Sequence, residues 1–292
     1  MTSEVTIRDL ETHADYAACV ALQRDTWGKN FNDAVPASIL LVSQKVGGVA
    51  AGAFDETGRL LGFVFGITGV HGGDVVHWSD MLAVRPESQN LGLGRRLKEF
   101  QRQAVARVGA RSIFWTYDPL VARNAHLNFN VFGVRAVEYA RDMYGSETGS
   151  ELHRAIGTDR IVVAWPVDDE ELARRKRETT AARDGGDYDN TPVLGDADRP
   201  DRKANESVGA GDHLRIAIPL DIAVMQGRDP ARAKSWRSST RAAFESSFVA
   251  GYNIEGVTVD AERDRGYYLL ARAVPGAEGA VSTTHSKKPS AR

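Results

Sequence analysis

Six residues in the middle of the chain have the types and spacing to bind an anion through their backbone: Gln89-Asn90-Leu91-Gly92-Leu93-Gly94. Glycine has no Cβ atom, so its backbone can turn sharply and approach an anion closely. A helix N-terminus presents unpaired N–H groups and the positive end of the helix dipole. If a helix follows this run, the residues predict a phosphate or diphosphate site, with an ordinary turn as the alternative.

The flanking segments favour the phosphate site. Residues 75–84 are rich in β-branched and apolar side chains and are closed by Pro86, which is typical of a strand. After the run, apolar residues recur at helical spacing: Leu93, Leu97, Phe100, Ala104 and Val108. A dinucleotide-binding motif would need a third glycine where the chain has Leu97, and the Gly-Lys-Ser/Thr of a P-loop does not follow.

With these residues the chain resembles the GNAT superfamily of acyl-CoA-dependent N-acetyltransferases. The superfamily's signature is a strand that ends in valine, a short turn with proline, and Gln/Arg-x-x-Gly-x-Gly/Ala at the start of a helix. Every signature position is filled, by Leu82-Ala83-Val84, residues 85–88, and residues 89–94 followed by Arg95. The resemblance implies an α/β (α+β) fold with a mixed, mostly antiparallel central sheet flanked by helices.

The resemblance also implies acetyl-CoA as co-substrate and assigns its contacts residue by residue. The end of the strand would pair with the pantetheine arm as an added strand would, and the loop would hold the diphosphate. Asn124 matches an asparagine that often contacts the pantetheine, although a helix N-cap or turn role is equally open. The implied coenzyme-binding residues are Leu82, Ala83, Val84, Gln89, Asn90, Leu91, Gly92, Leu93, Gly94, Arg95 and Asn124.

Acyl transfer would need a neutral amine to attack the thioester carbonyl, a backbone N–H to polarise the oxygen, and a base to remove a proton. Period-two alternation puts Asp80 on one strand face with four apolar residues, Val76, Trp78, Leu82 and Val84. A carboxyl group in such surroundings has a raised pKa, which suits a base. Asp80 is the first candidate base. His77 is the weaker one, because it lies on the opposite face unless a bulge swaps the faces.

One position departs from the superfamily's pattern. A tyrosine that protonates the leaving thiolate often stands four residues before the glycine that ends the next short helix, and here that position is Phe129. Tyr117, Tyr139 or Tyr144 could substitute for it. The departure leaves a non-catalytic module that binds or senses acyl-CoA as the alternative function.

Polar residues near the expected cleft are the candidates for binding the acceptor, which would be an amine on a small molecule or a peptide. They are Arg123, His126 and Asn128, with simple loop hydrogen bonding as the alternative. The resemblance covers about residues 5–165 and, more loosely, 213–272. Within the superfamily it is to a long-chain bacterial and archaeal subgroup that has no assigned substrate.

Composition limits the possible partners. The chain has 292 residues and a net charge of −2, so no overall basic field attracts nucleic acid. The single cysteine, Cys19, excludes an intrachain disulfide and a cysteine zinc site. We interpret the spacing of His71, Asp74 and His77 as a coincidence rather than a metal site.

The sequence has no signal-peptide pattern and no apolar run near the ~18 residues of a membrane span. We therefore expect a cytoplasmic monomer or homodimer without a metal, nucleic-acid or membrane partner.

Shifts in composition predict four segments. Residues 1–167 are expected to form the GNAT domain. Residues 168–212 contain acidic and basic runs and then Gly, Asp, Pro and Asn, which predicts a charged, largely disordered linker. Residues 213–273 are expected to form a β-α-β-β extension that packs on the first domain, because they are too few to build a core alone. Residues 274–292 are expected to be a disordered tail.

Overall fold

The computed structural model describes residues 4–29, 31–145, 156–185, 188, 190–199, 208–209, 211–272 and 282–285. These residues divide into two compact units. The first contains residues 4–115 and 166–169, and the second contains residues 116–145, 156–165 and those from 170 onward. The unit boundary therefore falls inside the expected GNAT domain. No helix in these described ranges is long and apolar enough to cross a bilayer.

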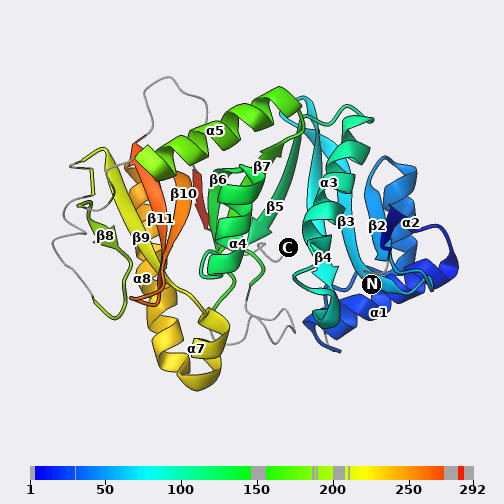
Figure 1. Ribbon diagram of the computed structural model, residues 1–292, viewed down its shortest axis with the longest axis horizontal. Coiled ribbons are helices and arrows are strands. Elements are labelled where there is room, and N and C mark those ends of the chain that lie inside the picture. The colour runs from blue at the N-terminus through cyan, green and yellow to red at the C-terminus, as the bar shows by residue number, and fades with distance from the viewer. Residues whose placement is uncertain are drawn as a thin grey trace, which may run out of the picture. The chain divides into compact units, whose positions relative to one another are not determined.

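The first unit contains a sheet whose neighbouring strands follow the chain order (Figure 1). The first four strands pair antiparallel, and the fourth pairs parallel with the beginning of the fifth. They are β1 (Thr6–Asp9), β2 (Val49–Phe54), β3 (Leu60–His71), β4 (Asp74–Val84) and β5 (Ser112–Tyr117). The strand expected over residues 75–84 is confirmed as β4, which begins one residue earlier.

The described residues of this unit form the α-helices α1 (His13–Trp27), α2 (Ala37–Lys45) and α3 (Leu93–Ala106). Thr12 caps α1 in a capping box with Asp15, which satisfies two donors that would otherwise lack a partner at the helix start. Apolar side chains of α1 and α2 form one core with Phe63 and Phe65 of β3. The other face of the strands is contacted by α3, which carries the glycine run at its N-terminus.

The first half of the second unit begins with α4 (Ala122–His126), which continues as the π-helical segment η2 (Leu127–Phe132). Gly133, with φ 71°, ends this segment in the left-handed conformation that glycine favours. The strands β6 (Arg135–Arg141) and β7 (Arg160–Pro166) follow and pair antiparallel. The short helix that the resemblance placed before Gly133 is thus present, and it begins at Ala122.

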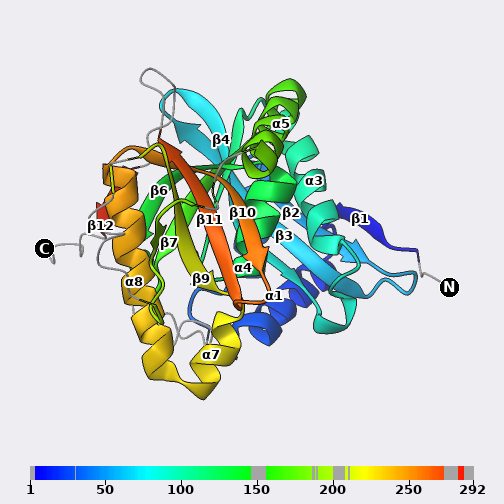
Figure 2. The same ribbon diagram turned by 60° about the vertical axis from the view of Figure 1, so that its left-hand side comes forward.

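A second sheet occupies the C-terminal part of this unit (Figure 2), with the strand order β10-β11-β9-β8. The strands are β8 (Val193–Leu194), β9 (His213–Pro219), β10 (Tyr252–Asp260) and β11 (Arg265–Arg272). The long helix α8 (Pro230–Val249) packs on β9 and β10 and buries Trp236 and Phe244. Asp229 caps α8, and a short helix that the sequence analysis missed, α7 (Ile222–Arg228), precedes it.

The expected linker and tail differ from the structure in two places. Residues 169–185 form the helix α5 (Asp169–Gly185) rather than a disordered segment. Its Glu, Ala, Arg and Lys residues are good helix formers, and Arg174 pairs with Glu178 one turn later at 2.7 Å. In the expected tail, β12 (Ser282–His285) pairs parallel with β6. Residues 186–187, 189, 200–207, 210, 273–281 and 286–292 lie outside the described residues.

Candidate active site

The strand β4 contains a bulge at Asp80. Phe65 of β3 is paired with Met81, and the next residue, Gly66, is paired with Ser79, which leaves Asp80 without a partner in the register. One extra residue bends a strand and reverses the alternation of its faces. Asp80 therefore marks the position where β4 changes which side chains it presents to each face.

The bulge corrects the predicted face of β4. Before it, His77 and Ser79 face α3, where they form hydrogen bonds with helix side chains. After it, Met81 and Ala83 join the apolar core formed with α1 and α2. Ideal alternation was therefore wrong in placing Val76, Trp78, Asp80, Leu82 and Val84 on one continuous face, and the alternative of a bulge that swaps the faces is confirmed.

One edge of β4 is open over its second half. The strand pairs with β3 along its whole length, whereas β5 pairs with it only at residues 76–78. Within the described residues of the first unit, no strand pairs with that edge over residues 79–84. The backbone of Leu82, Ala83 and Val84 lies on this stretch, where an extended molecule can add hydrogen bonds as a further strand would.

The glycine run follows directly after this open edge. The single turn η1 (Pro86–Ser88) leads into it, and Asn90 and Gly92 have φ values of 65° and 72°. The helix α3 begins at Leu93, and the amide of Arg96 donates to the Gly92 carbonyl at 3.1 Å. Among the described residues, no protein acceptor is found for the amides of residues 91–95. Since these amides lie at the positive end of the helix dipole, they can bind a diphosphate.

Asp80 can act as a base at the bulge. Its side chain is exposed, yet the surrounding protein still removes part of the solvation of its carboxyl group. This desolvation is the larger cause that raises the pKa of Asp80, and the negative charge of Asp33 is the smaller one. A carboxylate with a raised pKa and access to solvent can accept a proton from an amine.

His77 has a different environment. Its side chain is fully buried, its Nδ1 lies 2.9 Å from Thr68 Oγ1, and its Nε2 lies 3.0 Å from Gln101 Nε2. Burial, followed by the charge of Lys98, lowers the pKa of His77 to about 3. The imidazole is therefore neutral, and both of its nitrogens are engaged within the protein. This geometry gives no support to His77 as a base.

Lys98 is a residue that the sequence analysis missed. It is buried in the contact between α3 and β4, where its Nζ donates to Ser79 Oγ at 2.7 Å. Burial lowers the pKa of Lys98 well below its usual range. One signal was available, because Lys98 and Gln101 fall on the helical stripe whose apolar members are Leu93, Leu97 and Val105.

The strand, turn, amide loop and helix occur in the order that the resemblance predicted. No protein-family model and no curated protein matches the chain. Within the described residues, no cluster of three or more His, Cys, Asp or Glu side chains could hold a metal ion.

Similar solved structures are acetyltransferases. The ribosomal-protein-S18-alanine N-acetyltransferase from Escherichia coli is 20% identical over 56% of this chain and 95% of its own, with a TM-score of 0.43. An aminoglycoside 6'-N-acetyltransferase complexed with coenzyme A is 17% identical over 56% and 97%, with a TM-score of 0.42. A putative acetyltransferase from Salmonella typhimurium with acetyl-CoA is 20% identical over 56% and 95%, with a TM-score of 0.43.

The remaining sequence candidates belong to the second unit. Arg123, Asn124 and His126 are exposed on α4, and Asn128 is buried in η2. Asn124 is not an N-cap, because α4 begins at Ala122 after Val121. Exposure leaves the three α4 side chains accessible to a ligand, whereas Asn128 is enclosed.

Phe129 is buried. Its ring packs edge-on against Tyr117 and Tyr268, whose hydroxyl oxygens lie 3.1 Å apart. Tyr139 is also buried and donates to Asp159 at 2.7 Å. Burial raises the pKa of Tyr117 and of Tyr139. Of the tyrosines considered as substitutes, Tyr144 is the exposed one, with 42% of its surface accessible.

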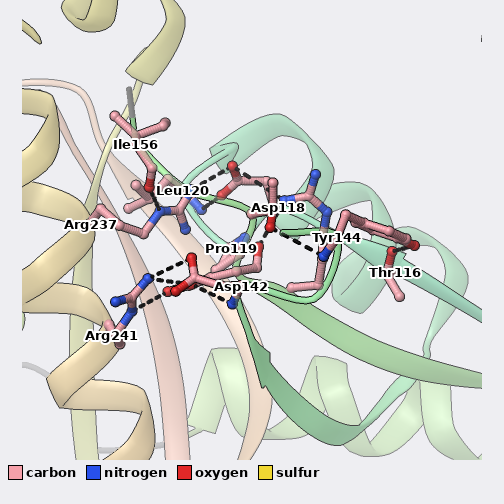
Figure 3. Close-up of polar contacts among 12 residues, drawn as sticks. Thr116, Asp118, Pro119, Leu120, Asp142, Tyr144, Ile156, Arg237 and Arg241 are labelled. Carbon is pink, nitrogen blue, oxygen red and sulfur yellow. Dashed lines mark hydrogen bonds and ion pairs between the residues drawn. The ribbon is translucent and has the colours of Figure 1, made fainter. Parts of the chain in front are cut away.

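A charged cluster in the second unit was also not predicted from the sequence (Figure 3). Arg237 of α8 donates to Asp118 at 2.5 Å and to the Ile156 carbonyl at 2.9 Å. Arg241, one turn later, contacts Asp142 at 3.1 Å and Asp159 at 2.6 Å. These partners lie 81 to 119 residues away in the sequence, so no local pattern could have indicated the pairs.

Proposed function

We propose that this GNAT protein is an acyl-CoA-dependent N-acyltransferase that transfers an acetyl group from acetyl-CoA to an amine. The single observation that carries the proposal is the continuity of the open edge of β4 with the amides of residues 91–95. One extended ligand with a diphosphate at one end fits this arrangement. Its diphosphate would bind the amides, its arm would follow Leu82, Ala83 and Val84, and its reactive end would lie toward Asp80.

Each part of the site has a role in this proposal. Asp80 would take the proton of the attacking amine, and a backbone N–H of β4 would polarise the thioester oxygen. Holding two reactants together can supply effective molarities of ~10⁵–10⁸ M, while proton transfer contributes typically ~10²–10⁴-fold. Orientation by β4 and the amide loop would therefore be the larger contribution.

The acceptor would be an amine on a small molecule or a peptide. Exposed Arg123 and His126, three residues apart on α4, are the side chains that we propose to contact it, and Asn124 would contact the pantetheine. Asn128 would act only by shaping this segment, because it is buried. The net charge of −2 supports such acceptors over nucleic acid and is compatible with a cytoplasmic location.

A second function, an acyl-CoA sensor without catalysis, is favoured by one observation. Phe129 occupies the position at which the resemblance implies a tyrosine acid, and its buried ring has no proton to give. A thiol with a pKa of about 8.5 leaves tolerably without an acid, so the loss of this tyrosine weakens the chemistry without preventing it.

Release of free thiol separates the two functions. The protein would be incubated with acetyl-CoA and a panel of amines, including amino sugars, polyamines and peptides with free N-termini, while free thiol and acetylated amine are followed. We expect amine-dependent thiol release for at least one acceptor class. Thermal stabilisation by CoA without acetylation of any amine would establish the sensor instead.

A further inference from the structure

A row of apolar side chains crosses three strands on the side of the first unit's sheet that faces α1 and α2. Ile67 of β3 is paired directly with Trp78 of β4, and Trp78 is paired directly with Phe114 of β5. Directly paired residues of neighbouring strands place their side chains next to each other on one face of the sheet. We call Ile67, Trp78 and Phe114 the apolar row.

Two observations place the apolar row on that side. Trp78 stands between His77 and Ser79, whose side chains form hydrogen bonds with α3, so its own side chain points to the opposite face. Ile67 follows Phe65 by two residues, and Phe65 belongs to the core formed with α1 and α2. The apolar row therefore extends that core outward along the sheet.

The apolar row is accessible to a ligand. Ile67 is 49% exposed, and the two aromatic members are partly exposed. Ser43 of α2 donates to the backbone carbonyl that precedes Ile67 at 2.8 Å, which places α2 beside the row. This helix exposes Val42, 51% accessible, and its one charged residue is Lys45. Single apolar side chains are common on protein surfaces, but a contiguous group of them is typical of a binding site.

The apolar row also adjoins the candidate base. Asp80 follows Trp78 by two residues, which corresponds to roughly 7 Å along a strand. The charge of Asp33, which lies between α1 and α2, acts on Asp80, so the carboxyl group of Asp80 is within electrostatic reach of the side on which the row lies. A molecule whose nitrogen is at Asp80 can therefore place its carbon atoms on the row.

The chemistry of these two neighbouring surfaces favours one class of amine. The carboxyl groups of Asp80 and Asp33 attract the ammonium form of an amine as it approaches. The apolar row offers a single hydrogen-bonding group, the indole N–H of Trp78. A polyamine or an amino sugar would bring further polar groups onto the row, where they would lose water without gaining a partner, and this is costly.

We propose that the apolar row binds the carbon skeleton of the acceptor, so that the acceptor is an amine with an aliphatic or aromatic body. This inference rests on the proposed acetyl transfer beside Asp80. In that transfer the amine nitrogen bonds to the thioester carbonyl carbon, the carbon–sulfur bond breaks, Asp80 takes a proton from the nitrogen, and coenzyme A leaves as the thiolate. The row binds and orients the amine and takes no part in these bond changes.

A homologous series of amines tests the proposal. The ratio kcat/KM would be measured with acetyl-CoA and each straight-chain amine from ethylamine to hexylamine, in which the basicity of the nitrogen hardly changes. Burial of each further methylene group should raise kcat/KM by about fourfold until the row is covered. The polar amine diglycolamine, which has as many heavy atoms as hexylamine, should have a kcat/KM at least about tenfold lower than hexylamine.

Variants of the row provide the second measurement. Ile67→Ser and Trp78→Ala should reduce the rise in kcat/KM per methylene group, because each removes part of the row. Val70→Ser is the matched control. Val70 is 73% exposed on the same strand, but it lies on the α3 side with Thr68, whose hydroxyl oxygen is 2.9 Å from His77 Nδ1. Its rise per methylene group should equal that of the wild type.

The outcomes separate this inference from the proposed function. Thermal stabilisation by CoA would verify that each variant folds, and the wild-type series decides the matter if a variant does not. Acetylation whose kcat/KM is independent of chain length, or higher for polyamines and amino sugars than for hexylamine, would overturn the inference and leave the transferase in place. An unchanged rise in folded Ile67→Ser and Trp78→Ala would also overturn it. Stabilisation by CoA without acetylation of any amine would remove the proposed function, and the inference with it.

Discussion

The guanidinium group of Arg241 donates two hydrogen bonds to the carboxylate of Asp159, one from Nε at 2.7 Å and one from Nη2 at 2.6 Å. Asp159 is fully buried just before β7, and Arg241 belongs to the C-terminal helix α8. Burial alone would raise the pKa of Asp159, but the hydrogen bonds from Arg241 and Tyr139 outweigh it and the pKa is lowered. A residue of the C-terminal helix α8 thus neutralises the buried carboxylate that precedes β7.

Replacing Arg241 should destabilise the protein. Arg241→Met leaves the buried carboxylate of Asp159 without its cation, and breaking a buried pair in this way costs about 3–5 kcal/mol. Chemical denaturation at pH 7 would measure the loss. Arg232→Met is the control on the same helix, because Arg232 is half exposed in its pair with Asp198 and should cost about 1 kcal/mol or less.

The same pair has a predictable pH dependence. Because the folded-state pKa of Asp159 is lowered, its contribution to stability is present above the unfolded pKa of about 3.9 and is lost as pH falls through the lower, folded value. The stability difference between wild type and Arg241→Met should therefore shrink below about pH 4. A difference that stays constant down to pH 2 would contradict this account.

Gly94→Asp should change helix stability and coenzyme affinity in opposite directions. An acidic residue in the first turn of α3 stabilises the helix by about 0.3–1 kcal/mol, and a Cβ atom at Gly94 meets only Leu82 Cδ2 at an ordinary 3.8 Å. The same charge repels a diphosphate on the neighbouring amides, so CoA should bind at least about tenfold more weakly. Calorimetric titration and thermal unfolding would measure the two effects.

Gly72→Asp controls for the added charge. Gly72 lies in the turn at the other end of β4, where a Cβ atom meets nothing within 4 Å. CoA affinity should be unchanged in this variant. If Gly94→Asp also bound CoA normally, the amides of residues 91–95 would not be the diphosphate site.

Asp80→Asn should lower turnover by about 10²-fold or more while leaving CoA affinity intact, because only the proton acceptor is removed. The wild-type rate should rise with pH as Asp80 ionises, at a pH above the usual range of a carboxyl group. Asp33→Asn removes the negative charge that disfavours ionised Asp80, so the rising limb of the profile should move to lower pH. An unchanged profile in Asp33→Asn would argue against Asp80 as the base.

Gly66→Ala tests the packing around the buried hydrogen bond between His77 of β4 and Gln101 of α3. A Cβ atom at Gly66 would lie 2.3 Å from His77 Nε2 and 2.5 Å from the Trp78 carbonyl oxygen, so the backbone has to shift. We expect a loss of about 1–3 kcal/mol in the free energy of unfolding. Gly69→Ala, on the same strand with nothing within 4 Å, should change stability by less than about 0.5 kcal/mol.

Much of the first unit was predictable because its signals are local. Pro86, the glycine run and the stripe that begins at Leu93 together indicate a strand, a loop and a helix start, and the structure has α3 beginning at Leu93. In contrast, the charge-rich composition of residues 169–185 predicts a linker, whereas the structure has a helix there. Charge density indicates solvent exposure, and an exposed segment rich in Glu, Ala, Arg and Lys can still be helical.

The sequence alone determined where the glycine loop and the start of α3 lie and which strand leads to them, since glycine spacing and helix starts depend on neighbouring residues. Only the tertiary structure decided that β4 has a bulge at Asp80, that Lys98 contacts Ser79, and that Arg241 neutralises Asp159. A bulge depends on the register of the partner strand, and a buried pair depends on residues that folding brings together. Neither feature produces a periodic pattern in the sequence.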